Sequence, residues 1–286
     1  MCRKLIVHIV GARPNFIKLA ALYPELCNDF DQLIVHTGQH YDYEMSKVFF
    51  EEFEIPEPNY DLDIGSGSHG YQTGEMLKRC EKVIVKERPK LVIVYGDTNS
   101  TLAGALASVK LGIPVAHVEA GLRCGIKFMP EEINRVLVDH ISELLFAPTK
   151  TALENLRREG VDKGVYFTGD VMLDLFLNYK SKFTSSHNRG FILVTVHRAE
   201  NTDDPNRLKE ILEALLESNE EIVFPMHPRT KRRIEELDFK WFLNSENIKV
   251  INPLSYINFL KLMGESKKVI TDSGGVQKEA YFMGKP

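Results

Sequence analysis

The stretch KLIVHIVGARPNFIKLAALYPELC, residues 4–27, joins an apolar run to an amphipathic one through a short turn. Its first eight residues are typical of a strand buried on both faces, and residues 15–27 are typical of a helix. Pro14 suits the first turn of that helix, so Arg13 is expected at its mouth. A strand followed at once by a helix is half of a βαβ unit and predicts a parallel sheet.

The same alternation runs through the rest of the chain. Further strands are predicted at 31–38, 90–97, 113–120, 143–149, 165–170, 191–197, 221–227, 247–253 and 267–273, with helices at 41–53, 71–87, 100–112 and 131–143 between the earlier ones. The polar segment 180–190 interrupts this rhythm once and is typical of a linker. We therefore expect an α/β protein of two Rossmann-like domains, 1–180 and 181–286, that face a cleft.

Polar residues follow nearly every predicted strand. They are Arg13, Gln39, His40, Asp97, Thr98, Glu119, Asp170, His197, Arg198, His227, Asp272 and Ser273. Any one of them could serve only as a helix cap. Because ligands of open α/β sheets bind outside the carboxyl ends of the strands, the whole pattern indicates a polar ligand site in the cleft.

The composition excludes several classes of protein. The net charge of −4, from 36 basic and 40 acidic side chains, disfavours a protein that binds nucleic acid through phosphate contacts. The four scattered cysteines contain no CxxC pair, which excludes a zinc ribbon and disfavours a disulfide framework. No apolar run reaches the roughly 20 residues of a membrane helix, and the N-terminus makes a poor signal peptide. We expect a cytoplasmic protein that binds neither nucleic acid nor membrane.

Three carboxylates are candidates for acid/base chemistry. Glu119 ends an apolar segment, where an unpartnered carboxylate is costly, so it needs a partner or a function. With Asp97 and Glu131 it forms a cluster suited to proton transfer at a sugar carbon. Glu131 and Arg135 lie four residues apart, and an ordinary surface ion pair explains them nearly as well.

The segment DSGGVQKEA, residues 272–280, indicates an anion site. Asp272 or Ser273 can cap a helix, and the two glycines after them leave the backbone N–H groups accessible to phosphate. Glu279, in the same helix, is placed to accept hydrogen bonds from ribose hydroxyls. His36 and His40 are four apart, but Gly38 between them disfavours a helical metal face, and we expect no metal site.

Seven segments occur in one order along the chain and together resemble the non-hydrolysing UDP-N-acetylglucosamine 2-epimerase family, which has the GT-B fold. They are GARPNFIK (11–18), HTGQH (36–40), YGDTNSTLAGALA (95–107), HVEAGLR (117–123), MPEEINR (129–135), VTVHRAEN (194–201) and DSGGVQKEA (272–280). The resemblance implies an enzyme without NAD or another cofactor that acts on a UDP-sugar. It implies elimination of UDP to leave a 2-acetamidoglucal, followed by re-addition with the opposite configuration at C2.

The resemblance also implies roles for residues. The catalytic and diphosphate-binding set is expected to be Arg13, Lys18, Asp97, Glu119, Glu131, Arg135 and His197. The remaining UDP contacts are expected to be Phe259, Ser273, Gly274, Gly275 and Glu279. Which carboxylate is the base at C2 stays open, and a homodimer is expected.

The sequence departs from the family pattern in places. Asn15-Phe16 replaces the commoner Glu-Ala, and Tyr41-Asp42 alters a region that binds an activating UDP-N-acetylglucosamine in some members. Segments 36–46 and 65–77 resemble a subgroup that acts on UDP-2,3-diacetamido-2,3-dideoxyglucuronate, which is therefore a second candidate substrate. Three competing functions stay open on the same motifs: a hydrolysing 2-epimerase, a GT-B glycosyltransferase and a non-catalytic sugar-nucleotide binder.

The chain stops at Lys285-Pro286, where the family pattern continues into a further strand and helices. The second domain is therefore expected to be truncated. A truncated domain is expected to lack a strand and to expose apolar surface on its last helix.

Overall fold

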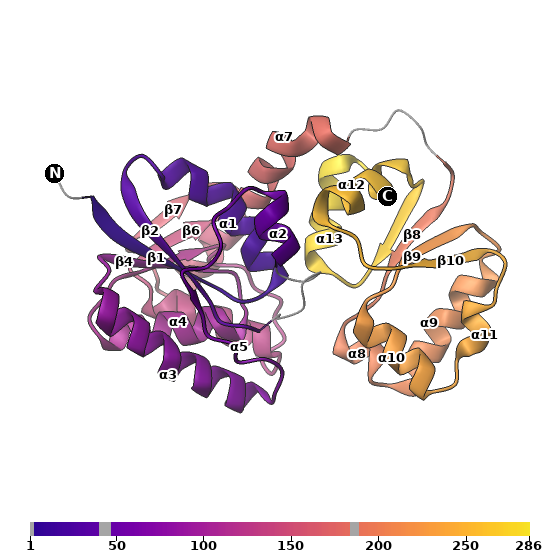
Figure 1. Cartoon of the computed structure of the whole chain (residues 1–286), viewed down its shortest axis with the longest axis horizontal. Coiled ribbons are helices and arrows are strands. Elements are labelled where there is room, and N and C mark those ends of the chain that lie inside the picture. Colours follow the sequence, from indigo (N-terminus) through magenta and orange to yellow (C-terminus); the bar gives the residue numbers. More distant parts are fainter. Residues whose placement is uncertain (1–2, 40–46, 184–188) are drawn as a thin grey trace. The chain divides into compact units, whose positions relative to one another are not determined.

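The computed structural model describes residues 3–39, 47–183 and 189–286. The chain divides into two compact units, Met1–Leu175 (unit 1) and Phe176–Pro286 (unit 2). Both units alternate strands and helices (Figure 1). The domain boundary expected after residue 180 lies in the same helix, α7 (Val171–Phe183), as the observed division.

Unit 1 is built on a seven-stranded parallel sheet. Its strands are β1 (Lys4–Val10), β2 (Phe30–His36), β3 (Tyr60–Asp61), β4 (Leu91–Tyr95), β5 (Val115–Val118), β6 (Leu144–Ala147) and β7 (Val165–Phe167). They lie in the order β3-β2-β1-β4-β5-β6-β7. The register pairs Val7 with Leu33 on one side and with Val92 on the other, so apolar residues of neighbouring strands align.

Helices cover both faces of this sheet. They are α1 (Arg13–Leu26), α2 (Lys47–Glu52), α3 (His69–Glu87), α4 (Asn99–Lys110), α5 (Pro130–Ile141), α6 (Lys150–Arg158) and the first part of α7. Helices α3, α4 and α5 pack on one face, and α1 contacts β1, β2 and β4 (Figure 1). Apolar residues of α3, α4 and α5 share a core with Val7, Ile9 and Val94 of the strands.

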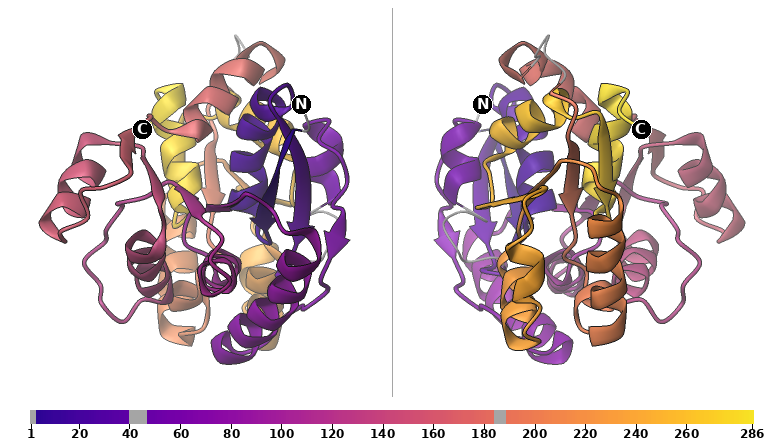
Figure 2. Two further views of the ribbon diagram at one scale, coloured as in Figure 1. Left: turned by 90° about the vertical axis from the view of Figure 1, so that its left-hand side faces the viewer. Right: turned by 90° about the vertical axis from the view of Figure 1, so that its right-hand side faces the viewer.

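Unit 2 repeats this plan with four parallel strands. They are β8 (Ile192–Thr195), β9 (Ile222–Pro225), β10 (Ile248–Ile251) and β11 (Lys268–Thr271), in the order β10-β9-β8-β11. The helices are α8 (Ala199–Thr202), α9 (Pro205–Glu217), α10 (Pro228–Glu236), α11 (Lys240–Leu243), α12 (Tyr256–Glu265) and α13 (Gly274–Met283). Helices α9 to α11 form a core with one face of the sheet, while α12 and α13 lie on the other face (Figure 2).

Both sheets have a topological switch point. In unit 1 the chain adds strands on one side of β1 and then returns to add β4 on its other side. In unit 2 the strands β8 and β11 have the same relation. Loops that leave such a neighbouring pair of strands diverge to opposite faces and open a crevice, which is where ligands of doubly wound sheets bind.

The predicted α/β class and its ten strands are confirmed, and β3 is an additional short strand. The predicted linker is partly wrong, because α7 continues through Phe183, four residues into that segment. The remainder of the linker at 184–188 lies outside the described residues, as does the first part of the helix expected at 41–53.

Candidate active site

A buried ion pair lies at the switch point of unit 1. Lys18, on the second turn of α1, places its Nζ 2.9 Å from Oε1 of Glu119, with only 4% and 11% of the two side chains exposed. Helix α1 starts at this edge because β1 ends at Val10 and Pro14 fixes the first turn of the helix. Both members of this pair were predicted as site residues from the sequence.

The backbone at Glu119 is left-handed, with φ of 77°. A side chain with a Cβ is disfavoured in this conformation, so such residues persist where the surroundings over-determine them. One restraint is the hydrogen bond that the Glu119 N–H donates to the carbonyl of Phe146 at 3.1 Å. The conformation directs a carboxylate into a loop that directly follows a buried strand, which is typical of functional sites.

Gly96 lies next to the Lys18–Glu119 ion pair. It follows β4 with φ of +63°, and a Cβ at this position would lie 2.7 Å from Nζ of Lys18 and 3.7 Å from Oε1 of Glu119. The glycine therefore lets the backbone after β4 approach the ammonium group closely. Asp97 is the next residue in the chain after Gly96.

Asp97 and Arg135 form a second ion pair in the site. Arg135 also lies 3.4 Å from Glu132, so it pairs with Asp97 and Glu132 and not, among the described contacts, with Glu131. The surface pair between Glu131 and Arg135 that sequence spacing allowed is therefore absent from the described structure. Asn134 reinforces the arrangement by donating from Nδ2 to the carbonyl of Asp97 at 2.9 Å.

Glu132 is an anchor for the loop before α5. Its carboxylate accepts hydrogen bonds from the backbone N–H groups of Cys124 and Gly125 at 3.0 and 2.9 Å. Burial alone would raise the pKa of Glu132, but these N–H groups and the nearby Arg135 lower it overall. Glu132 was not predicted, because its neighbour Glu131 fits the family motif and adjacent carboxylates in a helix cannot be ranked from spacing.

Asn15 organises the turn between β1 and α1. Its Oδ1 accepts from the N–H groups of Gly11 and Ala12 at 3.2 and 3.0 Å, and its Nδ2 donates to the carbonyl of Tyr95 at 2.8 Å. It therefore ties the ends of β1 and β4 together at the switch point. From the sequence Asn15 was identified as a departure from the family pattern, and these hydrogen bonds were not predicted. Arg13, at the mouth of α1, is half-buried and lies 5.6 Å from the ring centre of Phe49.

In unit 2 the loops after β8 and β11 are joined by Asp272. Its carboxylate accepts from the N–H groups of His197 and Arg198 at 3.0 and 2.9 Å and from Nδ2 of Asn201 at 3.0 Å. It also lies 3.4 Å from Nδ1 of His197. Asp272 thus orients the histidine loop, and Ser273 instead caps α13 by accepting from the N–H of Val276 at 3.4 Å.

The first turn of α13 has space for a ligand next to its backbone. A Cβ added at Gly274 would meet only Nη2 of Arg198, at 3.9 Å. Gly275 is half-buried in the same turn, and Glu279 is 2% exposed one turn further along. The imidazole of His197 stacks on that of His227, with ring centres 5.3 Å apart. Phe259, predicted to neighbour the base of the nucleotide, lies on α12 and is only 3% exposed.

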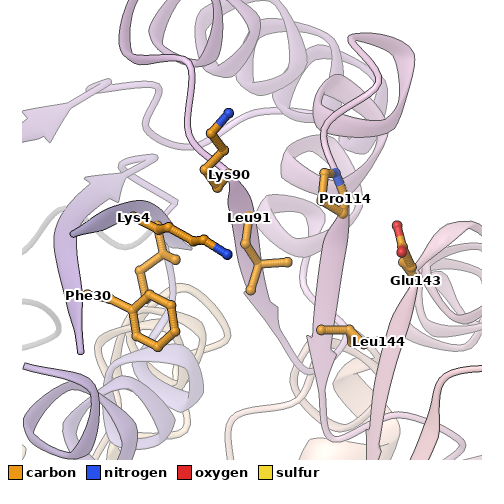
Figure 3. Close-up of a pocket in the computed structure, with 8 residues that line it drawn as sticks. Lys4, Phe30, Lys90, Leu91, Pro114, Glu143 and Leu144 are labelled. Atoms are coloured by element: carbon orange, nitrogen blue, oxygen red, sulfur yellow. The ribbon is translucent and has the colours of Figure 1, made fainter. Parts of the chain in front are cut away.

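One open pocket of about 260 Å³ lies elsewhere in unit 1 (Figure 3). It is lined by Lys4, Ile6, Phe30, Lys90, Leu91, Pro114, Glu143 and Leu144. These residues stand at the amino ends of the strands, so the pocket is at the opposite edge of the sheet from Lys18 and Glu119. It has no role in the candidate active site.

Each unit therefore offers different chemistry at its switch point. Unit 1 has carboxylates held by cations, which suits proton transfer. Unit 2 has the open N-terminus of a helix beside a histidine and an arginine, which suits a phosphate group. Two doubly wound units, each with polar side chains at its switch point, define an α/β protein of the GT-B fold.

Comparison with known proteins gives the family. The family model described as UDP-N-acetylglucosamine 2-epimerase matches residues 25–286, and the chain belongs to this family. A UDP-N-acetylglucosamine 2-epimerase homolog of Methanococcus maripaludis is 56% identical over 292 residues, covering 98% of this chain and 82% of the relative. A UDP-2,3-diacetamido-2,3-dideoxy-D-glucuronate 2-epimerase of Pseudomonas aeruginosa is 50% identical, covering 98% of this chain and 81% of the relative. The resemblance drawn from the sequence motifs is confirmed.

A solved structure supports the same family assignment. The crystal structure of Methanocaldococcus jannaschii UDP-GlcNAc 2-epimerase in complex with UDP-GlcNAc and UDP matches with a TM-score of 0.91 and 45% identity. The match covers 100% of this chain and 83% of that one.

Among the described residues, none of the helices combines the length and the apolar character that crossing a membrane requires.

Proposed function

We propose that this protein is a non-hydrolysing 2-epimerase that interconverts UDP-N-acetylglucosamine and UDP-N-acetylmannosamine. The observation that carries the proposal is the buried Lys18–Glu119 pair at the switch point of unit 1, and Asp97, which follows Gly96, forms a second ion pair with Arg135. The family and the relatives of known name support the substrate class. The reaction eliminates UDP to leave a 2-acetamidoglucal and adds UDP back with the opposite configuration at C2.

Inversion at C2 requires that a proton leaves one face of the sugar and returns to the other. Two proton-transfer groups meet this need, and Glu119 and Asp97 are our candidates. Each is paired with a cation: Glu119 with Lys18, and Asp97 with Arg135. Glu131 is half-buried at the start of α5 and is a third candidate for the same chemistry.

The diphosphate is a better leaving group when cations and N–H dipoles stabilise its developing charge. We assign this role to Arg13, Arg135, His197 and the first turn of α13 with Ser273, Gly274 and Gly275. The Nε of Arg135 is buried and has no hydrogen-bond partner among the described residues, so it has a donor to offer. Glu279 and Phe259 are proposed to contact the ribose and the uracil.

The reaction is tested in deuterated water. Epimerisation through a glucal exchanges the C2 proton, so the product should carry deuterium at C2 by NMR and mass spectrometry. The same assay separates the competing reactions, since a hydrolysing enzyme releases UDP with free N-acetylmannosamine and a glycosyltransferase yields a glycoside. Epimerised UDP-sugar that retains protium at C2 would contradict the elimination mechanism.

A second substrate needs a test because of the Pseudomonas aeruginosa relative. At 50% identity, its printed substrate, UDP-2,3-diacetamido-2,3-dideoxy-D-glucuronate, is our second candidate. Comparing kcat/KM for the two UDP-sugars decides between them. A preference of more than about 100-fold, equal to ~2.7 kcal/mol of transition-state binding, would assign the substrate.

Nucleotide binding is tested at α13. Gly274→Ala should leave the melting temperature of the free protein unchanged, because the new Cβ meets only Arg198 at 3.9 Å. It should reduce the UDP-induced rise in melting temperature, because a phosphate close to the backbone would meet the methyl group. Gly264→Ala, on α12, is the matched control, since its Cβ makes only ordinary contacts at 3.5 Å or more. A UDP-induced shift that survives in Gly274→Ala would remove the phosphate from this turn.

We also propose that the protein acts in the cytoplasm as a homodimer. Light scattering after size-exclusion chromatography should then give twice the chain mass of 32.6 kDa. A mass of one chain at micromolar concentration would contradict the dimer.

A further inference from the structure

A histidine that the proposed mechanism does not use lies directly behind the candidate reactive pair. His117 belongs to β5 and is fully buried. Its Nε2 lies 2.7 Å from the carbonyl oxygen of Gly96, and its Nδ1 lies 2.7 Å from Oδ1 of Asp139. It therefore joins the end of β4 to helix α5.

Both partners of this histidine are acceptors. A carbonyl oxygen has no proton to donate. Burial alone would raise the pKa of Asp139, but His117 and Arg123 lower it overall, so Asp139 is a carboxylate that also only accepts. Because both partners accept, a ring that satisfies the two hydrogen bonds at once carries a proton on each nitrogen.

Asp139 holds a second loop as well. Its Oδ2 accepts from the N–H of Gly121 at 3.0 Å and from Nη1 of Arg123 at 2.7 Å. Arg123 in turn pairs with the exposed Glu159 at 2.7 Å. One fully buried carboxylate thus holds Gly121 directly and Gly96 through His117.

These two attachment points flank the Lys18–Glu119 pair. Gly96 is the residue whose Cβ would reach within 2.7 Å of Nζ of Lys18. Glu119 lies between His117 and Gly121, both held by Asp139, and has the left-handed φ of 77°. A strained backbone keeps its conformation only while its neighbours are fixed, and the contacts of Asp139 fix both of them.

We propose that His117 and Asp139 are positioning residues, which hold the Glu119 carboxylate and the Lys18 ammonium group in the geometry needed for proton transfer. The inference rests on the proposed epimerase function. A displacement of about 1 Å in a reacting group lowers turnover by roughly 100-fold, so loss of these contacts should act mainly on kcat. Nucleotide binding should be spared, because the groups proposed to bind the diphosphate in unit 2 are not among the described contacts of either residue.

The test compares two buried histidines of the same sheet. His117→Asn cannot reach both Gly96 and Asp139, and its kcat should fall roughly 100-fold while KM and the UDP-induced shift in melting temperature change less than about threefold. His8→Asn is the matched control: His8 is also fully buried and hydrogen-bonded, to Tyr95 at 2.6 Å and Gln32 at 2.9 Å. It should lose comparable stability and keep wild-type kcat.

A milder variant separates positioning from folding. Asp139→Asn keeps the size of the side chain and its amide oxygen can still accept from Gly121 and Arg123, but its NH2 group then faces Nδ1 of His117 in place of an acceptor, so kcat should fall while the protein stays folded. Glu159→Gln, at the outer end of the same chain of contacts, should keep wild-type kcat. In addition, NMR of wild-type protein labelled with 15N-histidine should show one ring with protons on both nitrogens that is lost in His117→Asn.

The outcomes distinguish the two proposals. Wild-type protein without epimerase activity overturns the proposed function and this inference together. An active wild type with kcat of His117→Asn and Asp139→Asn within about threefold of the His8→Asn control overturns this inference alone. The same holds if the labelled wild-type protein shows no doubly protonated ring that depends on His117.

Discussion

Removing one member of the Lys18–Glu119 pair should destabilise unit 1 more than removing both. At 2.9 Å and an effective dielectric of about 20, the attraction between the two charges is ~6 kcal/mol. Desolvation of two charges that are 4% and 11% exposed offsets most of this, so the intact pair adds little net stability. A single substitution leaves the other charge buried, and we expect Lys18→Met to lower the free energy of unfolding by about 3–5 kcal/mol.

The double variant tests the coupling. Glu119→Gln should be milder than Lys18→Met, because an amide oxygen still accepts a hydrogen bond from the lysine. The variant with both changes has no unpaired buried charge. Its loss in the free energy of unfolding should be smaller than the sum of the two single losses by about 1.5–3 kcal/mol, which is the coupling energy. All three variants should lose at least about 100-fold in turnover, because the proposed proton-transfer group or its cation is missing.

Urea unfolding measures these energies. Trp241 is the single tryptophan of the chain and lies in unit 2, so its fluorescence follows unit 2, and far-UV circular dichroism follows both units. The expected change is therefore a shift of the circular dichroism transition. A coupling energy below about 0.5 kcal/mol would refute the claim that the two buried charges stabilise each other. Recovery of turnover in the double variant would show that the pair only stabilises the fold.

Three further predictions concern other parts of the structure. Gly96→Ala should lower both stability and turnover, because its Cβ would lie 2.7 Å from Nζ of Lys18 at a φ of +63°; wild-type melting and kcat would contradict this. Asp272→Asn should lower the melting temperature and weaken UDP binding in calorimetry, because the charge that accepts from the loop of His197 is lost, whereas equal affinity would assign Asp272 a purely local role. Burial lowers the pKa of His8 from 6.5 to about 4, so the unfolded chain binds a proton below pH 6.5 that the folded chain does not. The free energy of unfolding should therefore fall by roughly 3 kcal/mol between pH 6.5 and pH 4, and urea titrations should show a flatter dependence for His8→Asn; equal slopes would contradict the assignment.

Much of the fold could be predicted from sequence because the strands of a parallel sheet are buried on both faces. The resulting apolar runs, such as residues 191–197 and 221–227, are short, continuous and separated by longer amphipathic segments. The polar residues that follow them place the candidate site at the carboxyl edge of each sheet. Among the strands that the structure describes, the two-residue β3 was missed, since Tyr60 and Asp61 carry no apolar run.

Contacts inside the site were less accessible to sequence reasoning. Arg135 has acidic residues at several helical spacings, and its pairing with Asp97 depends on how α5 lies against the end of β4. His117 lies within an apolar strand segment and is indistinguishable there from a core histidine. One feature of the sequence could have indicated this site: Asp139 interrupts the apolar face of α5. In the structure Asp139 is fully buried. A buried aspartate in an amphipathic helix requires partners, and these partners are in the site.

The left-handed backbone at Glu119 creates a trade-off between stability and activity. Glycine adopts a φ of 77° without steric penalty, whereas for glutamate this conformation costs of order 1 kcal/mol or more. In variants that have already lost the charge of Lys18, glycine at position 119 would be favoured over the native residue by conformation alone. A directed-evolution screen that scores only heat resistance would therefore enrich clones without the carboxylate. Thermostabilisation of this enzyme needs selection for turnover in every round, because glycine, the residue with the lowest conformational energy at position 119, has no carboxylate for proton transfer.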